Sequence, residues 1–253
     1  MTSWRHALLC VAAIIAGCSK APESHTVNVA VAANFATVQD ELARKFTEKT
    51  GDTVRASVGS TGQLYSQIKN GAPFDLFLSA DAERPQQLEA ESLAVKGSRF
   101  TYALGQLALY APRSDSTTKP GPELLKSKFA HIAIANPKVA PYGAAALEVL
   151  KNLGQDTALA GKIVQGETLT QALQFVKSGA AELGFVAYSQ VVKEPAHTYW
   201  LVPANFHTRI VQDAVLLRPG ENNAAARAYL DFLRSAEAQA AIRAAGYDVP
   251  VQY

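Results

Sequence analysis

Residues 27–78 read VNVAVAANFATVQDELARKFTEKTGDTVRASVGSTGQLYSQIKNGAPFDLFL and decide the fold. Three short β-rich runs in this stretch have the length of strands, 27–31, 54–58 and 74–78, and the first reads as a buried strand. Between them lie two segments with helical spacing of apolar residues, 34–49 and 60–70. Gly51 and Gly71 follow these segments, as C-cap glycines do. Strands that alternate with helices of this length predict an α/β fold with a mainly parallel sheet.

The rest of the chain predicts a second lobe. A longer strand-like run covers residues 100–112, and a similar one covers 209–218. Between the two runs, the alternation of strands and helices restarts at 131–135, 142–153, 169–178 and 183–187, and two Ala-rich helices, 223–234 and 237–245, end the chain. Two long strands around a separate middle section predict two lobes, with residues 26–103 plus 211–253 as lobe I and 104–210 as lobe II. A ligand is then expected in the cleft between them.

The N-terminus has the composition of a lipoprotein signal peptide, which we assign to residues 1–17. Its apolar run, 7–16, is too short to span a bilayer. The run ends in Ile-Ala-Gly-Cys18, which resembles a bacterial lipobox, although ordinary signal cleavage is the alternative. We expect Cys18 to be lipidated, to anchor the chain in a membrane, and to begin a tether of residues 18–25. Cys10 leaves with the signal, so no thiol remains for a disulfide or a metal site.

Composition argues against several functions. The formal net charge is +2 and no basic run is present, so we expect no nucleic-acid partner. The histidines lack zinc-motif spacing, and no Gly-x-Ser-x-Gly elbow or nucleophile–base pair suggests an enzyme. Asp75 and Asp81 flank the third strand, where we expect capping or hinge hydrogen bonds rather than catalysis. We therefore predict a binding protein without catalytic residues or a cofactor.

Four junctions where a strand or extended turn leads into a helix are the candidate binding elements. They are residues 32–35 (AANF), 59–62 (GSTG), 140–143 (APYG) and 166–169 (GETL). The first N–H groups of a helix lack partners within it, and the helix dipole places about half a positive charge there. Several such ends at one cleft make an anion site without a charged side chain. The four turns contain no Lys or Arg, which argues against a carboxylate site that depends on Arg.

The stretches around these turns resemble the molybdate-binding protein (ModA) family of ABC importers. The resemblance runs from Val27 to Pro250 and is carried by VAVAANF (29–35), SVGSTG (57–62), QIKNGAPFDLFLSAD (67–81), SRFTYALGQLALY (98–110), IANPKVAPYG (134–143) and ELGFVA (182–187). It implies a two-lobed periplasmic-binding-protein fold of the class II type, with an oxyanion in the interlobe cleft. It also implies ligand-binding roles for Asn34, Thr61, Tyr142 and Leu169, with molybdenum bound only as molybdate.

Two positions depart from the family pattern. Ala33 stands where some members have a Thr hydroxyl, and Ala187 where others have a Tyr hydroxyl. Tyr188 is adjacent to Ala187, but on a strand it would point the other way. Asn34 lies where members donate from both backbone and side chain. The donor set therefore stays open, with Ala33 and Ser60 as candidate additional donors.

The resemblance implies capture of molybdate, or of the nearly equal-sized tungstate, and delivery to an ABC transporter permease. We expect a monomer at the periplasmic side of the cell envelope, held by its lipid. The alternatives are a binding protein for another tetrahedral oxyanion, such as sulfate, thiosulfate or phosphate, and an effector-sensing domain on the same fold. The lipobox and the lack of a helix-turn-helix segment argue against the sensor.

Overall fold

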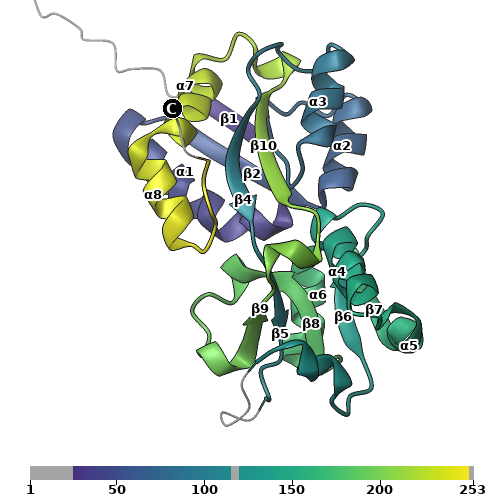
Figure 1. Ribbon diagram of the computed structural model, residues 1–253. Coiled ribbons are helices and arrows are strands. Elements are labelled where there is room, and N and C mark those ends of the chain that lie inside the picture. The colour runs from purple at the N-terminus through teal and green to yellow at the C-terminus, as the bar shows by residue number, and fades with distance from the viewer. Residues whose placement is uncertain (1–24, 115–119, 251–253) are drawn as a thin grey trace, which may run out of the picture.

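The computed structural model describes residues 25–114 and 120–250 (Figure 1). The predicted signal peptide, the lipidation at Cys18 and all but the end of the tether lie outside the described residues. In the part of the chain that is described, none of the helices has the length and apolar character needed to cross a membrane.

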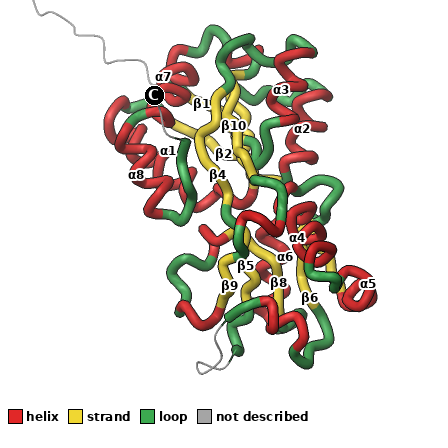
Figure 2. The backbone as a smooth tube through the Cα atoms, viewed as in Figure 1, coloured by secondary structure: helices red, strands yellow, loops and turns green. Residues whose placement is uncertain are grey.

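The described residues form two five-stranded sheets, one above the other in Figure 2. The first has the order β2-β1-β3-β10-β4 and the second the order β7-β6-β8-β5-β9. The first sheet contains β1 (Thr26–Ala32), β2 (Thr53–Gly59), β3 (Leu76–Leu78), β4 (Phe100–Gly105) and β10 (Ile210–Leu216). The second contains β5 (Leu107–Tyr110), β6 (Ile132–Ala135), β7 (Ile163–Gly166), β8 (Leu183–Ala187) and β9 (Tyr199–Leu201). The predicted two-lobed α/β fold is confirmed.

The sheets are mixed, which corrects the expectation of mainly parallel pairing. In the first sheet β1 pairs in parallel with β2 and β3, but β10 is antiparallel to β3 and β4. In the second, β6 is parallel to β7 and β8, while β5 is antiparallel to β8 and β9. The antiparallel strands are those next to the points where the chain passes from one sheet to the other.

The predicted strand at residues 100–112 is wrong as a single element. The structure divides it into β4 in the first sheet and β5 in the second, with Gln106 between them. Both halves are apolar, and the isolated Gly105 was the one local signal near the break, so the pattern was read as a single strand. At this break the chain crosses between the lobes.

Helices cover both faces of each sheet (Figure 1). In the first lobe they are α1 (Ala36–Thr50), which continues the short helix η1 (Ala33–Phe35), α2 (Thr61–Lys69), α3 (Glu83–Ala90), α7 (Ala224–Arg234) and α8 (Ala236–Ala244). In the second they are α4 (Pro141–Asn152), α5 (Asp156–Leu159) and α6 (Leu169–Ser178). Helices α3 and α5 and the edge strands β7 and β9 were not predicted from the sequence.

Burial of one helix face explains why these segments fold as they do. Helix α1 buries Val38, Leu42 and Phe46 against the sheet, and it ends at Gly51 with φ +80°, a conformation that favours glycine. Helix α2 packs Leu64 and Ile68 on the opposite face of the same sheet. Packing on the two faces of the first sheet thus fixes where α1 and α2 begin. The candidate site lies at these helix starts.

Candidate oxyanion-binding site

The structure brings all four predicted turns together around one small cavity between the lobes. Its lining contains every predicted ligand residue, both candidate additional donors and four neighbours: Ala32, Ala33, Asn34, Ser60, Thr61, Ala80, Ala140, Pro141, Tyr142 and Leu169. The cavity volume is about 10 Å³, which is about the space that one water molecule needs. The cavity is therefore small and has no space for a large ligand.

The position of the cavity follows from the topology. Strands β1, β2, β6 and β7 are parallel within their sheets, and each leads into one of the four turns at its carboxyl end. Ligand sites of α/β folds form at these ends because the following helices begin there. The helix N-termini therefore converge on the cavity from both lobes.

The second lobe contributes backbone N–H groups at the starts of α4 and α6. In α4 the first helical residue is Pro141, which has no N–H, so Tyr142 carries the first one. In α6 the side chain of Thr168 accepts from the N–H of Gln171 (3.1 Å), so this cap is already engaged. Leu169 is the first residue of α6, so no carbonyl within the helix lies four residues before it to accept from its N–H.

The first lobe contributes two hydroxyl groups at the start of α2. Thr61 is 1% exposed, and its Oγ1 accepts from the N–H of Ala80 (3.1 Å), which leaves the hydroxyl proton available. Ser60 is 3% exposed, and among the described residues its Oγ has no hydrogen-bond partner. Gln63 accepts from the N–H of Ser60 (3.3 Å) but does not engage the hydroxyl. An unpartnered buried hydroxyl at the cavity wall makes Ser60 a stronger donor candidate than its sequence position suggested.

Asn34 departs from the expectation of a side-chain donor. Its Nδ2 donates to Oε1 of Gln212 (2.8 Å) and to the hydroxyl of Tyr247 (3.2 Å), which uses both amide protons. The side chain therefore faces the interior of the first lobe. What Asn34 offers the cavity is its peptide N–H, at the start of the helical segment that continues as α1.

The lining contains no Lys, Arg, Asp or Glu. Its one titratable group is the phenol of Tyr142, and burial raises the pKa of Tyr142 well above its ordinary value, so the phenol stays neutral. All available donors are thus uncharged peptide or hydroxyl groups. Such a site stabilises an anion through fixed dipoles, without a counter-charge.

The two departures from the family pattern have a structural explanation. Ala33 lines the cavity, where it offers only its backbone. Ala187 is a fully buried residue at the end of β8 and is not part of the lining. Tyr188 was expected on the strand, but it begins a short helix (Tyr188–Gln190). Its ring packs on the ring of Tyr199, with 5.5 Å between the two centroids. No phenol thus replaces the missing one at this position.

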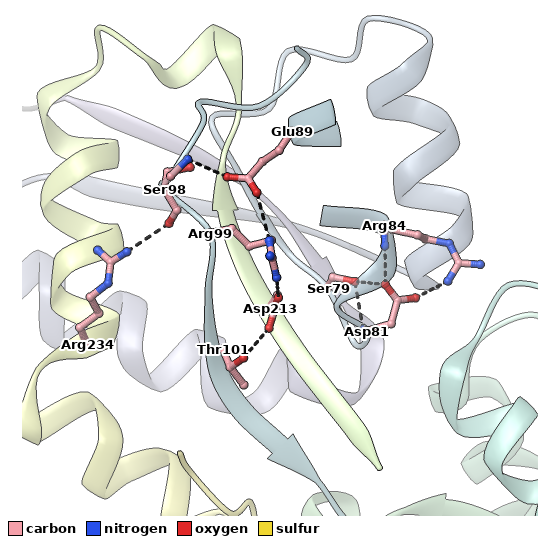
Figure 3. Close-up of polar contacts among 10 residues, drawn as sticks. Ser79, Asp81, Arg84, Glu89, Ser98, Arg99, Thr101, Asp213 and Arg234 are labelled. Carbon is pink, nitrogen blue, oxygen red and sulfur yellow. Dashed lines mark hydrogen bonds and ion pairs between the residues drawn. The ribbon is translucent and has the colours of Figure 1, made fainter. Parts of the chain in front are cut away.

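The two aspartates near β3 have structural roles. Asp75 accepts from the N–H of Asn28 (2.7 Å), which joins β3 to β1. Asp81 accepts from the N–H of Arg84 (3.0 Å), pairs with the Arg84 guanidinium and accepts from the hydroxyl of Ser79 (3.1 Å), as Figure 3 shows. These contacts agree with the predicted capping role.

Two larger grooves extend from the cavity between the lobes. One, of about 460 Å³, shares Ala80, Ala140 and Pro141 with it. The other, of about 500 Å³, shares Ala33 and Asn34. At the cavity itself the lobes touch, because the N–H of Gly62 in the first donates to the carbonyl of Val139 in the second (2.8 Å). The structure thus shows the lobes closed around the site.

A two-lobed α/β fold with a small ligand site between the lobes is the architecture of a solute-binding protein. The family model described as bacterial extracellular solute-binding protein matches residues 27–248, nearly all of the described chain.

Named relatives narrow the class. The molybdate-binding protein ModA of Rhodobacter capsulatus is 47% identical over 235 residues, which cover 93% of each chain. ModA of Azotobacter vinelandii is 48% identical over 230 residues, covering 90% of this chain and 91% of that one. The solved structure of the Azotobacter vinelandii periplasmic molybdate-binding protein matches with a TM-score of 0.82 and 39% identity, over 88% of this chain and 99% of that one. The chain therefore belongs to the bacterial extracellular solute-binding proteins and, among these, to the ModA family.

Proposed function

We propose that this protein captures molybdate in the cavity between its lobes and delivers it to an ABC importer. The observation that carries the proposal is the convergence of four helix starts on a small cavity without a charged side chain. The high identity to proteins named ModA supports the same ligand.

The donors available in the cavity suit this ligand. We assign the peptide N–H groups of Asn34, Thr61, Tyr142 and Leu169, together with the hydroxyls of Ser60 and Thr61. Molybdate keeps both negative charges at neutral pH and accepts hydrogen bonds at every oxygen. A fully deprotonated anion has no proton to donate, so a site that only donates hydrogen bonds suits it. Tungstate has the same chemistry and nearly the same size.

Capture and release then depend on the lobes moving apart. Asn34 and Thr61 come from the first sheet's helices, and Tyr142 and Leu169 from the second's. Strand membership supports lobe boundaries near Gln106 and before β10, close to the predicted 26–103 plus 211–253 and 104–210. Opening at these crossings separates the donors into two pairs.

The protein acts at the periplasmic side of the envelope, where a permease receives the anion. We propose that Cys18 carries the lipid that keeps it there, and that it works as a monomer. The lipobox supports the anchor.

Calorimetric titration with molybdate, tungstate, sulfate and thiosulfate tests the function. We expect molybdate and tungstate to bind with a one-to-one stoichiometry, and an excess of sulfate to leave molybdate bound. Displacement of molybdate by equimolar sulfate or thiosulfate would assign the protein to another oxyanion. Absence of heat and of a thermal shift with all four anions would refute oxyanion capture.

A further inference from the structure

A set of buried polar side chains joins the anion site to both lobes. Gln212 on β10 is its centre: Oε1 accepts from Nδ2 of Asn34 (2.8 Å) and from the hydroxyl of Tyr102 (3.1 Å). Its Nε2 donates to the hydroxyl of Tyr142 (3.1 Å). Tyr102 and Asn34 belong to the first lobe, whereas Tyr142 belongs to α4 of the second. The hydrogen bond between Gln212 and Tyr142 therefore crosses the cleft.

The phenol of Tyr142 is seated at the crossing between the lobes. Tyr142 is 2% exposed, and a Cβ at Gly105 would lie 2.2 Å from its hydroxyl oxygen. Gly105 is the last residue of β4, directly before the chain passes to the second lobe. The phenol of Tyr142 thus occupies the space that the side chain of any residue other than glycine at position 105 would fill.

Gln212 lies next to a β-bulge. Gln212 pairs with Ala103 and Asp213 with Thr101, so Tyr102 on β4 is the extra residue, and both Gln212 and Asp213 are buried. Asp213 is held by the hydroxyl of Thr101 (2.7 Å) and the guanidinium of Arg99 (2.5 Å). Arg99 in turn contacts Glu89 (3.1 Å), as Figure 3 shows. These contacts hold β10 and β4 together at the bulge, next to Gln212.

A second connection crosses the cleft from the same asparagine. The hydroxyl of Tyr247 donates to the carbonyl oxygen of Asn34 (2.7 Å) and accepts from the hydroxyl of Ser189 (2.9 Å). Tyr247 follows the last helix of the first lobe, and Ser189 follows β8 of the second. Asn34 is therefore bonded to the Tyr142 hydroxyl through Gln212, and to the Ser189 hydroxyl both through Tyr247 and by a longer direct contact to its own carbonyl oxygen (3.4 Å).

We propose that Tyr142 and Ser189 form a latch that holds the lobes closed and, through Gln212 and Tyr247, positions Asn34. This inference rests on the proposed function for the identity of the anion. The hydroxyl of Tyr142 accepts from Gln212, and this contact is distinct from the role of the Tyr142 peptide N–H. Because the latch bonds form only when the lobes meet, they stabilise the bound state and slow the release of the anion.

Tyr142→Phe tests the latch, since it keeps the ring and the peptide N–H and removes only the hydroxyl. Tyr102→Phe is the matched control, because it removes a buried hydroxyl from the same Gln212 oxygen within one lobe. We expect molybdate to bind Tyr142→Phe about 3- to 10-fold more weakly, the range for one hydrogen bond, through faster dissociation. Ser189→Ala should behave in the same way. Tyr102→Phe should lower the unfolding temperature but change the dissociation rate less than twofold.

A second measurement needs no anion. The sequence has only two cysteines, Cys10 and Cys18, so replacing both with serine permits spin labels at Glu41→Cys and Lys193→Cys. These exposed positions lie on opposite walls of the 500 Å³ groove, one on each lobe. In Tyr142→Phe we expect the distance between the labels to lengthen, and in Tyr102→Phe to match the parent.

The two proposals fail in different ways. If the parent protein binds molybdate while Tyr142→Phe and Tyr102→Phe release it at equal rates, the latch is wrong and the function stands. If the parent binds no molybdate, the function is wrong and the label distances decide: lengthening confined to Tyr142→Phe and Ser189→Ala supports the latch, and equal distances in all variants overturn it.

Discussion

Replacing Ser60 with alanine should move stability and affinity in opposite directions. Ser60 occupies the N-cap position of α2, where Ser→Ala ordinarily costs about 0.5–2 kcal/mol because a capping hydrogen bond is lost. Here the hydroxyl oxygen is buried and has no partner among the described residues, so no such bond is removed. A buried unsatisfied polar group costs about 1–3 kcal/mol. Ser60→Ala should therefore stabilise the protein without anion by about 1 kcal/mol or more.

The same substitution should weaken binding. A hydrogen bond to a charged group contributes about 1.5–3 kcal/mol, so loss of the Ser60 donor should raise the dissociation constant for molybdate about 10- to 150-fold. Calorimetry measures the affinity, and thermal unfolding without anion measures the stability. For a chain of this size, each kcal/mol corresponds to about 2–4 °C in Tm.

Thr61→Ala is the matched control for this experiment. The Thr61 hydroxyl also accepts from the N–H of Ala80, so its removal should cost about 1 kcal/mol of stability in addition to a similar loss of affinity. The two variants should thus agree in affinity and differ in the sign of their change in Tm. A lower Tm for Ser60→Ala, or a dissociation constant within twofold of the parent, would refute the assignment of Ser60 as an orphaned donor.

Four further predictions concern other parts of the molecule. Gly143→Ala should abolish measurable binding and lower Tm, because its Cβ would lie 2.1 Å from the carbonyl oxygen of Ala135 and displace the start of α4; unchanged affinity by calorimetry would contradict this. Molybdate affinity should stay constant from about pH 6.5 to 9, since the lining has no group that titrates there. Stability should fall as pH rises above about 10: burial raises the pKa of Tyr102 and Tyr142, so the unfolded chain loses its phenolic protons first, and a denaturation midpoint that is flat from pH 9 to 11 would contradict this. Cys18→Ser should move the protein from the membrane to the soluble fraction on cell fractionation, and a parent protein that is already soluble would disprove the anchor.

Local signals in the sequence predicted the four turns and the helices other than α3 and α5. Apolar spacing and the glycine after α1 predicted the first helix, because burial of one helix face and a left-handed C-cap depend on residues that are near in sequence. The starts of α4 and α6 were predicted within one residue for the same reason. The candidate lining could thus be proposed before its members were placed in space.

The sequence did not reveal the contacts that depend on distant residues. Gln212 and Tyr142 are separated by 70 positions, and Asn34 and Tyr247 by 213, so no periodicity connects them. For this reason the side chain of Asn34 was expected to face the anion, although Gln212 and Tyr247 use both of its amide protons. The break at Gln106 was missed because the strands on both sides of it are buried and apolar.

The neutral character of the site explains how one protein can hold a dianion firmly and still release it. A lysine or arginine at the cavity would attract the anion whether the lobes were open or closed, since the attraction between charges extends over several ångströms. Peptide and hydroxyl donors act only at hydrogen-bond distance. Because the peptide donors are divided equally between the lobes, separation of the lobes removes half of them at once. Affinity is therefore a property of the closed arrangement, and any contact that opens the lobes, including one made by a permease, converts tight binding into release.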